Sequence, residues 1–181
     1  MTVGMGIGRF IYTPILPGMM QGLGLSASDA GIIASANYLG YLVGALVGAG
    51  RWAEGREHGV AIGSLVASTL LTGAMALTET VSAFVAIRFL AGIASAFMMV
   101  FMSTIVFSRL ARAGRSDLSA WHFSGVGAGM AISALVTGTL AFFAASWRVD
   151  WLAGSVVSAI GVLIVYLLLD REPSPSVRPA P

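Results

Sequence analysis

The chain has 181 residues, of which 57% are apolar and only 10% are charged, and it also contains 23 glycines. A soluble domain has about 25% charged residues and about 45–50% apolar residues with glycine included, so this composition argues against a water-soluble globule. The net charge is only +2, lysine is absent, and the ten arginines form no basic stripe, which excludes nucleic-acid binding. Because the chain has no cysteine, it can form neither a disulfide nor a thiolate metal site.

Stretches without Asp, Glu or Arg divide the chain, and each is at least 19 residues long: 10–28, 30–50, 58–78, 89–108, 118–147 and 151–169. A helix needs roughly 20 residues to cross a hydrocarbon core about 30 Å thick. Two stretches extend backward past a single arginine, Arg9 and Arg88. We therefore predict an all-α integral membrane protein with six transmembrane helices, over about 2–22, 30–50, 59–78, 82–107, 119–144 and 150–169.

The first apolar stretch has a second interpretation, because residues 25–28 (Leu-Ser-Ala-Ser) are similar to a signal-peptide cleavage site. However, its only positive charge, Arg9, lies inside the apolar stretch, and Pro14 and Pro17 interrupt that stretch. We therefore expect a retained helix that is kinked near the prolines. The second helix has a clear start, since Ser26 and Asp29 have the spacing of a helix-capping pair.

The arginines are distributed unequally between the two sets of loops. Seven lie in 51–58, 109–117 and 170–181, whereas the opposite loops contain only Arg148. Because cytoplasmic loops accumulate positive charge, we predict that both termini lie in the cytoplasm. Residues 170–181 are polar and rich in proline, which indicates an unstructured tail or the start of a linker.

Small residues repeat every four positions in two of the predicted helices. In lipid, such stripes let two helix backbones approach closely. We expect them to serve packing among the six helices of this chain, and contact with a partner outside it is the alternative. The residues that we predict to serve helix packing are Gly40, Gly44, Gly48, Gly125 and Gly129.

Polar side chains inside the bilayer are costly and are often functional, so Arg9 and Arg88 are the first candidates for contact with an anionic or polar ligand. The alternatives are snorkelling toward the headgroups and hydrogen bonding between helices. Helical spacing groups other polar residues with them, and His122 is a candidate proton carrier because histidine titrates near neutral pH. The predicted substrate-binding or transport residues are Arg9, Tyr12, Asn37, Tyr41, Arg88 and His122, with Tyr38 on the edge of the same helix face as Asn37 and Tyr41.

No enzyme motif is found. His122 and Ser124 are two positions apart, so on a helix they point in nearly opposite directions and form no catalytic pair. The glycine-rich start at 4–8 is not followed by the Lys-Ser/Thr of a phosphate-binding loop. With two histidines, and with Asp29, Glu79 and Asp150 at helix ends or in loops, we expect no metal site, no cofactor and no enzymatic activity.

The first two predicted helices contain the motifs GIGRFIYTPILPGM (6–19) and ANYLGYLVGALVG (36–48). Arg88 and Gly92 form an Arg-x-x-x-Gly motif, residues 125–129 are glycine-rich, and the loop 48–57 has Glu54 near the position where a family loop motif has Asp. Together these features resemble the N-terminal half of a major facilitator superfamily (MFS) transporter, of the YbfB/YjiJ-type branch. The resemblance covers essentially the whole chain.

The resemblance implies a twelve-helix transporter built from two six-helix halves, with the solute site between them. This chain would then be one half bundle. The second half would come from the same gene product or from a homodimer. The implied function is secondary active transport of a small polar or anionic solute by alternating access, with protons as a candidate coupling ion. The alternative is a non-transporting membrane protein, either a truncated remnant or an assembly partner.

The family resemblance also implies roles for the predicted site residues and for the glycine stripes. It implies that helices one, two, four and five contribute residues to the cavity, in agreement with the candidates chosen from helical spacing. It further implies that helices two and five pack on the other half, which is one explanation for their glycine stripes. The lipid bilayer, the solute and the second half are therefore the predicted partners.

Overall fold

The computed structural model describes residues 1–168, which form helices and turns with no β-strand among them. The predicted tail at 170–181 lies outside the described residues. The main elements are a short π-helix η1 (Thr2–Ile7) and the α-helices α1 (Tyr12–Leu23), α2 (Ala27–Gly48), α3 (Glu57–Ala74), α4 (Val81–Arg112), α5 (Ser119–Phe142) and α6 (Trp147–Leu168). Three 3-10 turns lie beside them: η2 (Arg51–Ala53), η3 (Met75–Leu77) and η4 (Ser116–Leu118).

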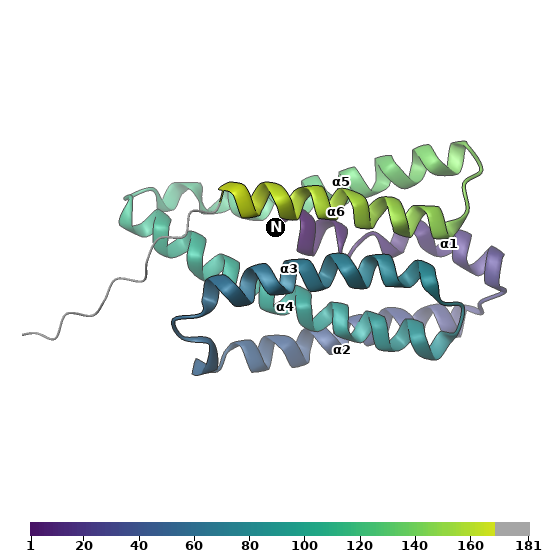
Figure 1. Cartoon of the computed structure of the whole chain (residues 1–181), viewed down its shortest axis with the longest axis horizontal. Coiled ribbons are helices and arrows are strands. Elements are labelled where there is room, and N and C mark those ends of the chain that lie inside the picture. Colours follow the sequence, from purple (N-terminus) through teal and green to yellow (C-terminus); the bar gives the residue numbers. More distant parts are fainter. Residues whose placement is uncertain (169–181) are drawn as a thin grey trace, which may run out of the picture.

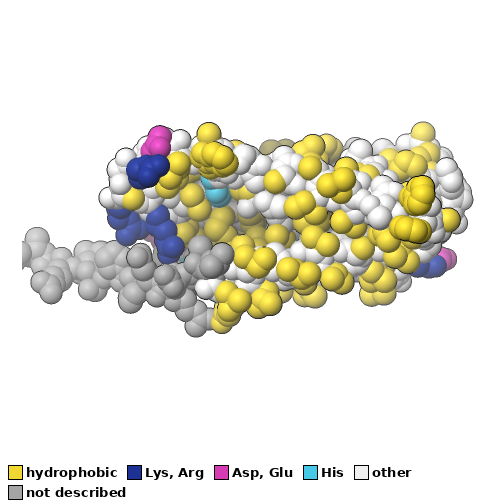
Figure 2. Space-filling model, turned by 90° about the horizontal axis from the view of Figure 1, so that it is seen from above, with side chains coloured by type: hydrophobic (Ala, Val, Ile, Leu, Met, Phe, Trp, Pro, Cys, Tyr) yellow, Lys and Arg dark blue, Asp and Glu magenta, His cyan; other side chains and the backbone are white. Residues whose placement is uncertain are grey.

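Five helical segments are long and apolar enough to cross a membrane: Ala27–Gly48, Glu57–Leu77, Val81–Arg112, Ser116–Phe142 and Trp147–Leu167. Figure 2 shows that, on the face it presents, the charged side chains lie near the two ends of the molecule and apolar side chains cover the middle. A bilayer requires this distribution, since charged groups avoid the hydrocarbon core. The predicted all-helical membrane architecture is therefore confirmed, with five candidate spans in the described residues.

The beginning of the chain differs from the single helix predicted over 2–22. It consists of η1 and α1, separated by turns over residues 8–11. Gly8 N–H donates to the Val3 carbonyl, as in a π-helix, and Thr13 N–H donates to the Phe10 carbonyl instead of the Arg9 carbonyl. Pro14 has no N–H to donate at the next position, so the α-helical ladder is interrupted here. With 12 residues, α1 is too short to cross a bilayer alone.

Local capping fixes the starts and ends of several helices. The predicted capping pair is present: Ser26 Oγ accepts a hydrogen bond from Asp29 N–H, and Ser26 N–H donates to the Asp29 carboxylate at 3.0 Å. Thr80 caps the start of α4 in the same manner, by accepting from Ala83 N–H. Gly24, which follows α1, has φ of 65°, a left-handed conformation that glycine adopts without strain.

The helices surround η1. In Figure 1, α5 and α6 run side by side on one side of the bundle and α2, α3 and α4 lie on the other, with η1 near the middle and α1 toward one end. η1 contacts α3, α4, α5 and α6, while α2 makes its main contact with α4. The first residues of the chain therefore lie at the centre of the bundle, where the long helices meet.

Glycines allow the backbones of α2 and α4 to touch. A Cβ atom on Gly40 would overlap the backbone carbonyl of Phe89, and a Cβ on Gly92 would overlap the backbone of Asn37. Gly44 faces the Ile93 backbone in the same way, and Gly48 makes ordinary van der Waals contact with α4 side chains. The Gly40, Gly44 and Gly48 stripe is thus covered by α4 of the same chain, and a second half is not needed to explain it.

The second glycine stripe, on α5, packs against η1. A Cβ on Gly129 would overlap backbone atoms of Thr2 and Gly6, while one on Gly125 would lie 3.1 Å from Thr2 Oγ1. η1 also contributes glycines to its contacts with the long helices. Gly6 faces Gly129 of α5, and Gly4 faces the Met98 side chain of α4. The small residues on both sides therefore let η1 sit deep between the long helices.

We predict that Gly40→Ala destabilises the protein whereas Gly31→Ala, on the same helix, does not. The added methyl group at residue 40 forces the α4 backbone away, at an expected loss of about 1–3 kcal/mol. Gly31 has open space where its Cβ would lie, so alanine there gains helix propensity without a clash. Thermal unfolding of the two purified variants in detergent measures the difference. Equal melting temperatures would contradict the close α2–α4 contact.

Candidate functional site

Arg88 of α4 completes the hydrogen bonding of the interrupted first helix. Its side chain is buried, with 4% of the residue surface exposed. One terminal nitrogen lies 3.4 Å from the Gly8 carbonyl oxygen, and the other donates to the Arg9 carbonyl oxygen at 3.1 Å. In an unbroken α-helix these two carbonyls would accept from Tyr12 and Thr13 N–H groups. The guanidinium group therefore replaces the backbone donors that are missing at the break.

Two further predicted site residues hold Arg88 in place. Asn37 of α2 donates from its side-chain amide to the Arg88 carbonyl oxygen at 3.0 Å. The Tyr12 ring lies 4.9 Å from the guanidinium carbon of Arg88, and the Tyr12 hydroxyl donates to the Ala30 carbonyl at 3.0 Å. Asn37 and Tyr12 are both buried, and the ring of Trp151 packs beside Tyr12. Asn37, Tyr12 and the two terminal nitrogens of Arg88 thus have partners inside the bundle, whereas the Arg88 Nε atom is buried without one within residues 1–168.

Arg9 is in a different environment, between aromatic rings on a partly open surface. Its guanidinium carbon lies 4.2 Å from the ring centre of Tyr41, 4.9 Å from that of Tyr38 and 5.7 Å from that of Phe10. A guanidinium group is attracted to aromatic faces, and such contacts also fix its orientation. Tyr38 is 59% exposed, so the rings open toward the outside of the bundle. The Arg9 Nε atom is buried and has no hydrogen-bond partner within residues 1–168.

Arg9 and Arg88 form no ion pair in the part of the chain that the structure describes. There, ion pairs join Arg51 to Glu54, Arg115 to Asp117 and Arg148 to Glu79, all in loops or at helix ends, and none of them involves Arg9 or Arg88. Buried charges are normally paired, because removing an ion from water is unfavourable. Since the terminal nitrogens of Arg88 already face carbonyl oxygens, Arg9 is the group of this two-arginine centre that suits an anion.

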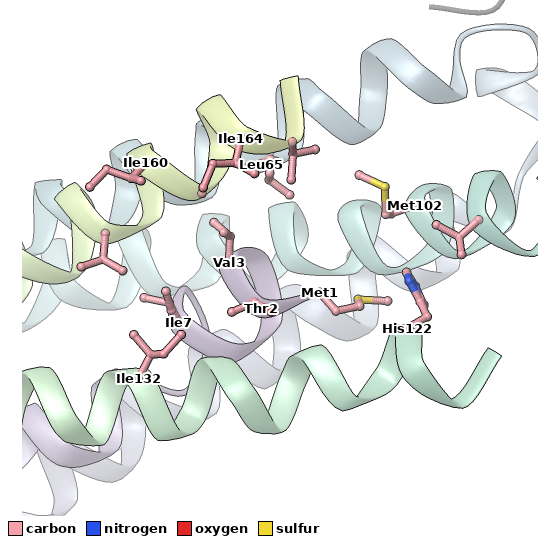
Figure 3. Close-up of a pocket in the computed structure, with 14 residues that line it drawn as sticks. Met1, Thr2, Val3, Ile7, Leu65, Met102, His122, Ile132, Ile160 and Ile164 are labelled. Carbon is pink, nitrogen blue, oxygen red and sulfur yellow. The ribbon is translucent and has the colours of Figure 1, made fainter. Parts of the chain in front are cut away.

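His122 is not brought together with the other predicted site residues. It lines a cavity of about 560 Å³ between α5, α6 and η1, in which most lining residues are apolar. Figure 3 shows His122 next to Met1 at one end of this cavity. Its Nε2 atom lies 3.2 Å from Ser103 Oγ, and the Phe107 ring packs against the imidazole. Five of the six predicted residues thus form one cluster, and the sixth lies apart.

Two residues are more prominent in the structure than in the sequence prediction. Helical spacing predicts Tyr38 only at the edge of its helix face, yet its ring contacts Arg9. The three-residue spacing between Tyr38 and Tyr41 puts both rings on neighbouring positions of the helix, where they can contact the same guanidinium group. Asp150, in the first turn of α6, is only 8% exposed, and its Oδ1 atom has no partner among the described residues. Its position near a helix end gave no indication of this burial.

The helical fold, the apolar spans and the buried cationic centre define a multi-pass membrane protein with a polar site inside its bundle. A family model described as "Uncharacterised MFS-type transporter YbfB" matches residues 1–181. The chain therefore belongs to this family of MFS-type transporters, as the motifs in its first two helices predicted. A comparison with curated proteins gives no match.

We predict that Arg88→Met destabilises the fold much more than Arg9→Met. The first variant leaves the Gly8 and Arg9 carbonyls without their charged donor, at an expected loss of about 2–4 kcal/mol. The second removes no hydrogen bond within residues 1–168, so a change of less than about 1 kcal/mol is expected. Denaturation in detergent followed by circular dichroism compares the two. A larger loss for Arg9→Met would contradict the role assigned to Arg88.

Proposed function

We propose that the protein transports a small anionic or polar solute by alternating access and that the solute binds at Arg9. The observation that supports this most strongly is the guanidinium group of Arg9. It lies between Tyr38 and Tyr41, is partly exposed, and forms no ion pair with a carboxylate within residues 1–168. A forked cation held in this manner suits the planar recognition of an oxyanion. Arg88, Tyr12 and Asn37 then serve to position the segment that carries Arg9.

We further propose that residues 1–23 form the sixth membrane span. η1 and α1 follow one another along the bundle, and Arg88 supplies the hydrogen bonds that the break between them lacks. Broken helices are tolerated in membranes where neighbouring side chains satisfy the freed backbone groups. In transporters, such breaks typically lie at the binding site.

The proposed mechanism requires a second six-helix half, from the same gene product or from a second copy of this chain. A single bundle has no opposing body against which to rock, and the solute site of this superfamily lies between two halves. The exposed ring of Tyr38 supports this assignment, because it leaves the Arg9 centre open on one side of the bundle. His122 stays a candidate proton carrier, separate from the Arg9 centre.

The proposed location is the inner membrane, with both termini in the cytoplasm. The natural absence of cysteine allows a direct test with single-cysteine variants. We expect a membrane-impermeant maleimide to label Ser146→Cys in intact spheroplasts and to label Ser116→Cys only after permeabilisation, because the arginine-rich loop lies inside. Both positions are exposed in the structure, so their reactivities are comparable. The reverse labelling pattern would contradict the proposed orientation.

The transport proposal is tested by uptake of isotope-labelled lactate, succinate, phosphate and sulfate into membrane vesicles that contain the full native protein. We expect at least one of these anions to be taken up. Arg9→Gln is expected to reduce the uptake at least about tenfold, because it removes the charged fork. Arg112→Gln is the matched control, since Arg112 is an exposed arginine at the far end of α4, and it should respond like the unmodified protein.

Two results would contradict the proposal. Anion uptake that is unchanged in Arg9→Gln would remove Arg9 from the site. A complete absence of uptake, together with normal membrane insertion, would favour the alternative of a non-transporting membrane protein. Insertion is checked in each variant by the amount of protein recovered in the membrane fraction.

A further inference from the structure

The two arginines of the cationic centre differ in how many donors they can offer to a ligand. Arg88 is almost fully buried and directs both terminal nitrogens toward the carbonyls of Gly8 and Arg9. Its ring contact with Tyr12 closes one face of the guanidinium plane. A ligand can reach Arg88 only if the first helix loses these bonds. Arg88 therefore holds the site together and does not present its charge to the solute.

Arg9 is thus the one intramembrane cation of the described residues that a ligand can contact directly. Within residues 1–168 its guanidinium group makes ring contacts but no hydrogen bond or ion pair. One guanidinium group matches one carboxylate through two parallel N–H···O bonds. On this bundle a second negative group of the same ligand would meet no other open cation, because Arg88 is buried and its terminal nitrogens already face carbonyl oxygens. A desolvated charge without a partner is strongly unfavourable.

The aromatic side chains around Arg9 indicate the chemistry of the part of the ligand that does not contact the guanidinium group. Tyr38, Tyr41 and Phe10 surround the guanidinium group with aromatic rings, and Tyr38 is the most exposed of the three. A flat or apolar body can lie against the exposed ring while its carboxylate faces Arg9. Aromatic contacts of this type contribute about 0.5–1.5 kcal/mol beyond the burial of area.

We propose that the solute is a monocarboxylate with a planar or apolar body, held by Arg9 through its carboxylate and by Tyr38 through its body. This inference rests on the proposed function and narrows it, because it selects singly charged carboxylates over dicarboxylates. Arg88 has no direct contact with the solute.

Binding to the full native protein in detergent, measured by calorimetry, tests this inference. The probes are benzoate, its dianionic analogue phthalate, its neutral analogue benzamide, and acetate, which has the carboxylate but no ring. We expect benzoate to bind at least about tenfold more tightly than each of the other three. Tyr38→Leu should weaken benzoate about tenfold and leave acetate nearly unchanged. Arg9→Lys should weaken both carboxylates, because lysine lacks the planar fork.

The outcomes separate the substrate class from the proposed function. Phthalate binding as tightly as benzoate, with both lost in Arg9→Gln, would overturn the monocarboxylate class and leave anion binding at Arg9 intact. Benzoate binding that Arg9→Gln does not change would overturn both. If benzoate fails to bind while an inorganic anion binds in an Arg9-dependent manner, the monocarboxylate class is overturned and anion binding at Arg9 is retained. Circular dichroism of each variant confirms that the helices are retained.

Discussion

The structure depends on one constraint, which is the break in the first helix at residues 8–11. A broken helix inside a membrane leaves backbone carbonyls without donors, and no water is available in the hydrocarbon core to satisfy them. Here the guanidinium group of Arg88 faces the Gly8 and Arg9 carbonyls from α4. Much of the remaining architecture serves to place Arg88 within reach of that break. Asn37 anchors the Arg88 backbone, and Gly40 and Gly92 bring α2 against α4 at the same level.

This arrangement separates two roles that the sequence assigns to the arginines together. Arg88 acts as a structural cation, since its charge is spread over backbone carbonyls and the Tyr12 ring. Because the turn at residues 8–11 is held by Arg88, the Arg9 side chain projects between Tyr38 and Tyr41 instead of following a regular helix face. Of the two guanidinium groups, that of Arg9 is therefore the one open to a ligand, whereas that of Arg88 is buried with only its Nε atom unpartnered within residues 1–168. This is the physical basis for proposing a solute with one negative charge.

The sequence predicts those features of the architecture that depend on neighbouring residues or on the average hydropathy of a segment. Long stretches without charge indicate membrane-spanning helices, and five such helices are present among the described residues. The Ser26–Asp29 pair correctly predicts the start of α2, because capping involves only neighbouring residues. The motifs in the first two helices correctly indicate the family.

Features that depend on distant residues are less accessible from the sequence. Pro14 and Pro17 predict a kink, but the break lies before them and its stability depends on Arg88, 79 residues away from Arg9. Helical spacing groups Tyr12, Asn37 and Tyr41 with the arginines, yet it does not separate buried anchors from open ligand contacts. His122 illustrates the same limit, since its place in another cavity follows from how α5 packs on η1.

The central claim is that Arg88 supports the broken helix while Arg9 alone is open to the solute. Nitrogen-15 NMR of the guanidinium groups, in protein labelled only at arginine, tests this claim most directly. Arg9→Lys and Arg88→Lys assign the two intramembrane resonances. The account predicts that added benzoate shifts the Arg9 resonance and leaves that of Arg88 in place. A shift of the Arg88 resonance with Arg9 unchanged would contradict it.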